Sequence, residues 1–232
     1  MTLYEVHSAL ARSLGDPFAE TSLSTIYDGV RYSAEARKGY LYRACCSIIN
    51  EVVTQLAPVP REQGTEILVS LFPSMINYLQ YSSIVSSTTT IYDFYDNAVN
   101  PQDYRCAYII NASLHDSSNT RNTPVPIVSP FKASKITSRA YRSQMNDCIA
   151  WIAFTRPDAL FIGLNQGAND YTGDVFEITF LRYPQNQVLT DGTVGFDFES
   201  SYMNAVLNKA TLYGMTDGGD LTPEQILPLL AK

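Results

Sequence analysis

The chain has 232 residues, of which 45% are hydrophobic and 17% are charged, and its formal net charge at pH 7 is −7. This hydrophobic content is enough to fill the core of one large domain, or of a main domain with an inserted module, and it argues against a disordered chain. Duplex DNA attracts cationic proteins, and this chain carries the opposite charge. We therefore expect no DNA-binding function, although a negative surface would suit the wall of a channel that repels DNA.

The sequence shows no targeting segment, membrane span or metal site. Residues 1–14 are amphipathic and lack the basic and apolar regions of a signal peptide. No apolar run approaches the ~18 residues of a membrane span. The four cysteines form no C-x-x-C pair, and only two histidines accompany them, which argues against zinc. We expect no cofactor, no metal and no membrane contact, and assembly in a reducing cytoplasm.

The first segment of the chain is expected to be a short helix. Thr2 and Glu5 form the pattern of a capping box, and apolar residues at helical spacing follow as far as Gly15. Gly15 is followed by Asp16-Pro17, a combination that commonly ends a helix. Residues 16–32 are therefore expected to be a loop.

A longer helix is expected after this loop. Ser33 can cap its N-terminus, and a broad apolar stripe at helical spacing extends to Pro58. Residues 62–71 are expected to form a further helix. Pro73 then interrupts the pattern, and residues 75–79 are expected to resume helical structure at a different angle.

Residues 82–184 have the character of a β module. Residues 82–90 are rich in Ser, Thr and β-branched residues, which favour extended structure. Strands are expected at three further places: residues 105–115, a hairpin over 148–164 that turns at 156–158, and residues 175–183, which alternate in period two. Residues 116–130, rich in Ser, Asn, Thr and Pro, are expected to form an exposed loop.

Helical character returns over residues 185–232. Ser200 is expected to cap a helix that ends at Gly214. A second capping box begins at Thr222 and predicts a helix of barely two turns, because Pro228 interrupts it. So short a helix is marginal in water, and its apolar residues need a surface on their own subunit or on a neighbouring protein. These residues are Ile226, Leu227, Leu229 and Leu230.

The order of the elements predicts an α+β fold. A helical bundle built from both chain ends would carry an antiparallel β module inserted between them. We expect three segments: an N-terminal helical part over residues 1–81, the β-rich module over 82–184, and a C-terminal helix with a terminal tail over 185–232.

No pattern in the sequence supports a catalytic site. His115 with Cys106 or Cys148 would supply a base and a nucleophile, but no motif surrounds these residues. The acidic segments 170–174 and 217–220 lack the alternating carboxylates and distal glutamate of an EF-hand calcium loop. Buried thiols and solvated turns are the simpler interpretation, so we expect a non-enzymatic protein.

The aromatic content favours contacts with other proteins. The chain holds 16 tyrosines, 10 phenylalanines and one tryptophan, and aromatic residues are enriched at the centres of interfaces, where charged residues are depleted. The segment Tyr92–Asp96 combines aromatic rings with two carboxylates. We interpret it as an interface patch rather than an acid–base pair. Core packing explains any one aromatic residue equally well.

Two segments carry a family resemblance. The first segment continues from a helix-entry turn into a Tyr-Leu-x-x-Ala pattern over residues 40–44. The turn contains Asp28, Gly29, Arg31, Tyr32 and Ser33. The second is the strand-like segment 176–184, which ends in Arg-Tyr-Pro and precedes the helix expected from Ser200. Together they resemble the head-to-tail adaptor proteins of tailed bacteriophages, in which such a turn caps a helix and a closing helix packs back on the first.

The resemblance implies a structural protein of the virion neck, at the head–tail junction, assembled in the host cytoplasm. Such adaptors form closed rings of about twelve copies between the portal protein and the next neck or tail component. DNA passes through the central channel without sequence-specific binding. We expect the apolar residues of the terminal tail to dock onto the portal, and residues 28–33 (the 28–33 turn) to fix how the long helix joins the bundle.

Three alternatives stay open. The polar stretch within residues 82–175 is longer than a minimal adaptor needs, so the chain also fits another neck or tail ring, such as a tail terminator or a tail-completion protein. A β-rich virion protein that binds a receptor or a carbohydrate is a second class. A hydrolase of unrecognised type is a third, which the search for a site disfavours. A symmetric ring around a channel would separate the adaptor from the last two, and a fibrous trimer would indicate receptor binding.

Overall fold

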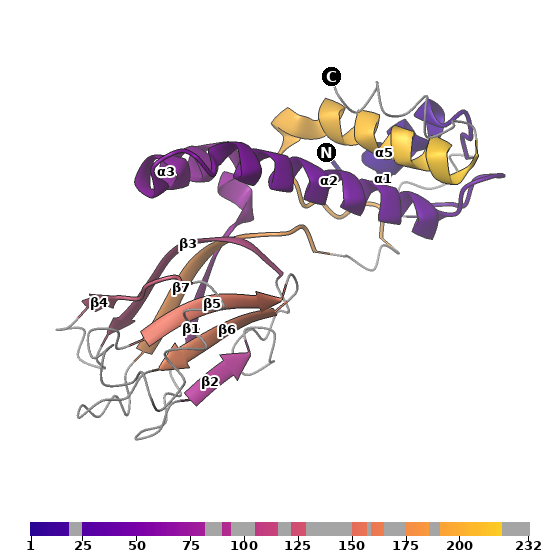
Figure 1. The fold of residues 1–232 in the computed structure, drawn as a ribbon. Coiled ribbons are helices and arrows are strands. Elements are labelled where there is room, and N and C mark those ends of the chain that lie inside the picture. The colour runs from indigo at the N-terminus through magenta and orange to yellow at the C-terminus, as the bar shows by residue number, and fades with distance from the viewer. Residues whose placement is uncertain are drawn as a thin grey trace. The chain divides into compact units, whose positions relative to one another are not determined.

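The computed structural model describes residues 1–18, 25–81, 90–93, 105–115, 122–128, 150–156, 159–164, 175–185 and 191–219. The fold is α+β, as predicted (Figure 1). The chain divides into two compact units: a helical unit formed by Met1–Met75 together with Tyr183–Lys232, and a β unit formed by Ile76–Arg182. Both chain ends therefore build the helical unit, and the β unit is an insertion in it.

Helix α1 (Leu3–Ser13) begins at the predicted capping box. The Thr2 hydroxyl accepts from the Glu5 backbone N–H at 3.3 Å, and the Glu5 carboxylate accepts from the Thr2 N–H at 2.8 Å. Beyond the helix, Gly15 adopts a positive φ of 67°, which glycine tolerates best. The apolar face of α1 is buried in the helical unit, and its fully covered residues include Val6 and Leu10.

Helix α2 (Ala34–Leu56) is the longest helix among the described residues. The Ser33 hydroxyl caps it, as predicted, and accepts from the Ala36 N–H at 3.1 Å. Helix α3 (Arg61–Leu71) follows, and then the short 3-10 helix η1 (Pro73–Met75). The prediction of helical structure over residues 75–79 is wrong, because this segment begins strand β1 (Ile76–Tyr81).

Helix α5 (Met203–Asp217) lies alongside α2 and α1 (Figure 1). Ser200 was predicted to cap it, but Ser200 starts the short 3-10 turn η3 (Ser200–Tyr202), and α5 has no side-chain cap. The helix also continues through Gly214 instead of ending there. Gly214 has a packing role, since a Cβ at this position would lie only 2.7 Å from Leu14 Cδ2.

The described strands of the β unit form two antiparallel sheets. The four-stranded sheet has the order β1-β7-β3-β4, in which β7 is Val175–Arg182, β3 is Cys106–His115 and β4 is Asn122–Pro124. The three-stranded sheet has the order β2-β6-β5, in which β2 is Thr90–Asp93, β6 is Ala159–Leu164 and β5 is Ala150–Arg156. Strands β5 and β6 form the predicted hairpin, and β3 and β7 match two further predicted strands.

Strand β7 has the predicted period of two. Phe176, Ile178 and Phe180 are buried, while the alternating residues 175, 177 and 179 are partly exposed. The predicted loop over residues 116–130 needs correction. It contains β4, which pairs with β3, and its residues Val125 and Val128 are buried rather than exposed.

Candidate functional site

The five residues predicted to shape the start of the long helix lie together in the 28–33 turn. The Gly29 N–H donates to the Tyr32 carbonyl at 2.9 Å and closes the turn. The Asp28 carboxylate accepts from the Ala34 N–H at 2.6 Å, and Ser33 caps the same helical turn. Both side chains satisfy N–H groups that the start of a helix leaves without partners. The turn and the first turn of α2 are thus one hydrogen-bonded structure.

Asp16 fixes this turn from outside, a role that was not predicted from the sequence. Its carboxylate accepts the backbone N–H groups of Val30 at 2.8 Å, Arg31 at 2.9 Å and Tyr32 at 2.9 Å. Burial opposes ionisation of Asp16, but these backbone hydrogen bonds outweigh burial and hold its pKa below the ordinary value. The available signal was a carboxylate directly after the Gly15 stop, which was interpreted only as the end of a helix.

Arg37, in the first turn of α2, anchors the same turn from inside the helical unit. Its side chain is fully buried. The guanidinium donates to the Tyr32 carbonyl at 2.8 Å and to the Tyr27 carbonyl, and it lies 4.9 Å from the centre of the Phe18 ring. A buried cation needs such acceptors, because desolvation would otherwise be costly. The backbone around the turn is therefore held from two sides.

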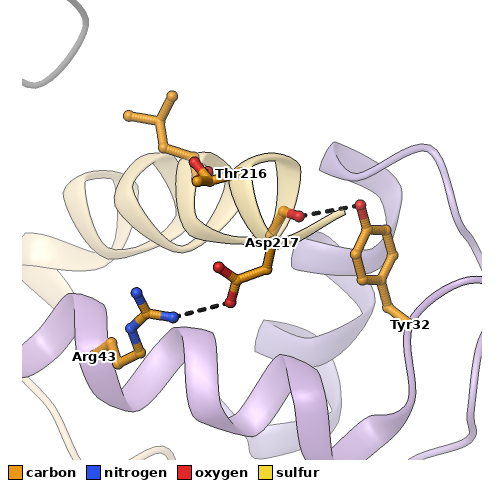
Figure 2. A network of polar contacts seen from close by, with 6 residues as sticks. Tyr32, Arg43, Thr216 and Asp217 are labelled. Carbon is orange, nitrogen blue, oxygen red and sulfur yellow. Dashed lines mark hydrogen bonds and ion pairs between the residues drawn. The ribbon is translucent and has the colours of Figure 1, made fainter. Parts of the chain in front are cut away.

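The turn is also joined to the C-terminal end of α5. The Tyr32 hydroxyl donates to the Gly214 carbonyl at 3.2 Å, and Arg43 of α2 forms a 3.0 Å ion pair with Asp217 (Figure 2). The Thr216 hydroxyl forms its hydrogen bond within α5, where it donates to the Leu212 carbonyl one turn earlier. These contacts connect residues from the two ends of the chain. Asp217 was predicted to lie in an acidic loop, but it is the last residue of α5.

An open groove runs along α2 beside α5. Arg43 lies over the Tyr213 ring at 4.5 Å from its centre, and Glu51 forms a 2.6 Å ion pair with Lys209. The groove residues on α2 recur at intervals of three and four, so they share one face of the helix. The lining consists of Tyr42, Arg43, Cys46, Ser47, Asn50, Glu51, Thr54 and Gln55 of α2, with Tyr213 of α5. We call this surface the α2–α5 groove.

A polar cluster in the four-stranded sheet surrounds Glu177 of β7. Its carboxylate contacts His115 Nε2 at 2.7 Å and Gln80 Nε2 at 3.0 Å, and it accepts from the Tyr78 hydroxyl. Burial raises the pKa of Glu177 above its ordinary value. Cys106, which was considered with His115 from the sequence and rejected as a catalytic pair, lies at the opposite end of β3, a separation of roughly 30 Å along an extended strand. This cysteine and histidine therefore cannot act as a catalytic pair.

His7 is the second histidine, and it is buried in α1. Neither ring nitrogen has a hydrogen-bond partner among the described residues. Burial, together with the charges of Arg37 and Lys38, lowers the pKa of His7 to about 3. The ring is therefore neutral at physiological pH and packs as a core residue.

Several predicted features lie outside the described residues. They include the terminal docking residues Ile226, Leu227, Leu229 and Leu230, as well as Cys148 and the segment 170–174. Within the described ranges, no group of three His, Cys, Asp or Glu residues is placed to hold a metal ion. Over the same ranges, no helix is long and apolar enough to span a membrane.

Comparisons with known proteins identify no family for this chain. No protein-family model matches the sequence, and no curated protein matches it either. The arrangement of the described residues is therefore the basis for interpreting the site: a fixed turn, a seam between the two chain ends and an open groove, all within the helical unit.

Proposed function

We propose that this chain is a non-enzymatic structural protein of a tailed-phage virion, a ring-forming head-to-tail adaptor that joins the portal to the tail around the DNA channel. One observation carries the proposal: the hydrogen bond from Tyr32 to the Gly214 carbonyl. It joins the 28–33 turn, which carries the first part of the resemblance, to the helix that follows the second part. The closing helix thus packs against the helix that the turn begins, as the resemblance requires.

The architecture of the helical unit suits a subunit of a ring. In a closed ring each copy presents two different surfaces in a fixed geometry, because the ring closes only if every head-to-tail contact has the same relative orientation. The contacts of Asp16, Arg37 and Tyr32 hold the N-terminal end of α2 in place. Two ion pairs further along α2 connect this helix to α5. The net charge of −7 favours passage of DNA without adhesion to the wall.

Both histidines of the chain lie within the described residues and are buried there. His7 is neutral and buried, and His115 and Glu177 contact each other in the sheet. A non-enzymatic protein that acts by contacts alone accounts for these placements. Its partners would be copies of itself, the portal protein and the next neck or tail component, at the virion neck.

Cryo-electron microscopy of the virion neck tests the proposal. We expect a ring of about twelve copies of this chain around a central channel, next to the portal. Finding the chain outside any ring would refute the proposal. A fibrous trimer at the tail tip would instead assign the β unit to receptor or carbohydrate binding.

A further inference from the structure

Glu177 of β7 is the point at which side chains from three neighbouring strands meet. Tyr78 and Gln80 reach its carboxylate from β1 on one side, and His115 reaches it from β3 on the other. The strand register accounts for this arrangement, because Gln80 and Ser113 both lie directly opposite Glu177. One carboxylate therefore connects the first three strands of the order β1-β7-β3-β4.

The contact between His115 and Glu177 differs in geometry from the other two. Nε2 of His115 lies 2.7 Å from a carboxylate oxygen of Glu177, but it is not aligned with that oxygen for a hydrogen bond. A neutral imidazole gains little from such an approach, whereas a protonated imidazole gains the attraction between opposite charges. Histidine is the side chain whose charge ordinarily changes between about pH 5 and 8. The strength of this contact therefore depends on pH.

Burial makes this dependence larger than it would be on an open surface. The His115 side chain is 8% exposed, and that of Glu177 is 22% exposed. Water screens charges poorly at such positions, so an unpaired charge is more costly there. Burial also raises the pKa of Glu177, and a raised pKa means that stability falls as the pH rises and this carboxyl ionises. A protonated His115 would offset that cost by supplying a cation.

No further charged group lies beside this pair in the described part of the four-stranded sheet. The titratable side chain that β1 adds to the cluster is Tyr78, which donates to Glu177. β4 and the residues that follow it, as far as Val128, have no titratable side chain. The remaining titratable residues of β3 and β7 lie at the opposite end of these strands, and they are Cys106, Tyr108 and Arg182.

We propose that the His115–Glu177 contact is a pH-sensitive clasp, which holds β3 to β7 more firmly in mildly acidic solution than in neutral or alkaline solution. Protonated His115 completes an ion pair with the ionised carboxylate, and loss of the proton leaves that carboxylate facing a neutral ring. The clasped end of the sheet includes the pairing of β3 with β4, because His115 lies opposite Asn122. The inference concerns the β unit alone and does not depend on the proposed adaptor function.

Hydrogen exchange of the full-length protein, followed by mass spectrometry at about pH 5.5 and about pH 7.5, tests this clasp. Dividing each rate by the intrinsic rate of the unfolded chain at the same pH leaves a difference that reports opening of the sheet. We expect the amides of β3 and β7 near His115 to be roughly threefold to tenfold better protected at the lower pH. Protonation of His7 on unfolding acts in the opposite direction, because burial lowers its pKa to about 3 in the folded protein.

Three variants identify the groups responsible. Glu177→Gln keeps the shape of the side chain but removes its charge, and His115→Gln removes the titrating ring. Each should abolish the difference in protection between the two pH values. Tyr78→Phe removes a neighbouring donor and keeps the pair, so the difference should persist in this matched control.

The wild-type comparison is decisive even if a variant folds poorly. Equal protection of β3 and β7 at both pH values overturns the inference, because the clasp would then not respond to pH. A difference that survives in Glu177→Gln or in His115→Gln also overturns it, because another group would be responsible. A difference that is lost in Tyr78→Phe overturns the assignment to the histidine–carboxylate pair.

Discussion

Replacing Asp16 with asparagine should destabilise the helical unit strongly, although the change is nearly isosteric. In the structure one carboxylate oxygen accepts from Val30, and the other accepts from Arg31 and Tyr32. Asparagine retains only one acceptor oxygen and places an NH₂ group where the other oxygen stood. At least one backbone N–H would then face a donor instead of an acceptor.

The size of the effect follows from the bonds that are lost. A hydrogen bond to an ionised group contributes about 1.5–3 kcal/mol. The hydrogen bonds that asparagine keeps are also weaker, because their acceptor is no longer charged. We therefore expect Asp16→Asn to lower the free energy of unfolding of the helical unit by about 2–4 kcal/mol. For a protein of this size, the midpoint of thermal unfolding should fall by roughly 5–15 °C.

Thermal unfolding followed by helical circular dichroism measures this change. Asp217→Asn is a matched control, because it removes a surface ion pair of 3.0 Å that should contribute no more than about 1 kcal/mol. Trp151 is the single tryptophan and belongs to β5, so its fluorescence follows the β unit as an internal reference. Asp16→Asn destabilising the protein no more than Asp217→Asn would refute the role assigned to Asp16.

Three further predictions concern packing, pH and the terminal tail. Gly214→Ala should lower the free energy of unfolding by about 1–3 kcal/mol, because the new Cβ would overlap Leu14. Gly39→Ala should stabilise α2 slightly, because no atom lies within 4 Å of its new Cβ. Thermal unfolding distinguishes the two variants. For His7, the unfolded chain binds a proton near pH 6.5 and the folded chain only near pH 3, so stability should fall by up to ~1.4 kcal/mol per pH unit as the pH drops from 6.5 to 4.5. His7→Leu should flatten that part of the urea-unfolding profile, and an unchanged slope would contradict the assignment. Deleting residues 220–232 should leave the thermal midpoint of the helical unit unchanged and abolish attachment to heads in a reconstitution assay; a large fall in the midpoint would show instead that the tail stabilises its own subunit.

Local signals in the sequence were sufficient where the physical cause is local. The capping box of Thr2 and Glu5 and the cap at Ser33 involve residues three apart, so their pattern alone determines the hydrogen bonds. The alternation of β7 likewise reflects one strand with one buried face. Of the predicted site, the residues of the 28–33 turn could be identified because an Asp-Gly turn precedes a helix cap.

The missed features depend on residues far apart in the chain. Residues 76–81 form a strand because they pair with residues 176–181 of β7, about a hundred positions away, and no local pattern reveals that partner. Asp16 acts on N–H groups fourteen to sixteen residues later. Gly214 has the local signature of a helix end, but its lack of a side chain instead makes room for the Leu14 side chain that packs against it. Tertiary packing decided each of these cases.

The register of β1 with β7 makes the β unit an exchangeable module. Ile76 pairs directly with Leu181, so the first residue of the insertion lies about 5 Å from its next-to-last residue. A short linker from Met75 to Tyr183 could therefore replace the whole insertion without stretching the helical scaffold. Recombination at these two positions would let a lineage acquire a new β unit while it keeps the scaffold unchanged, and the two parts of the molecule are free to diverge at different rates.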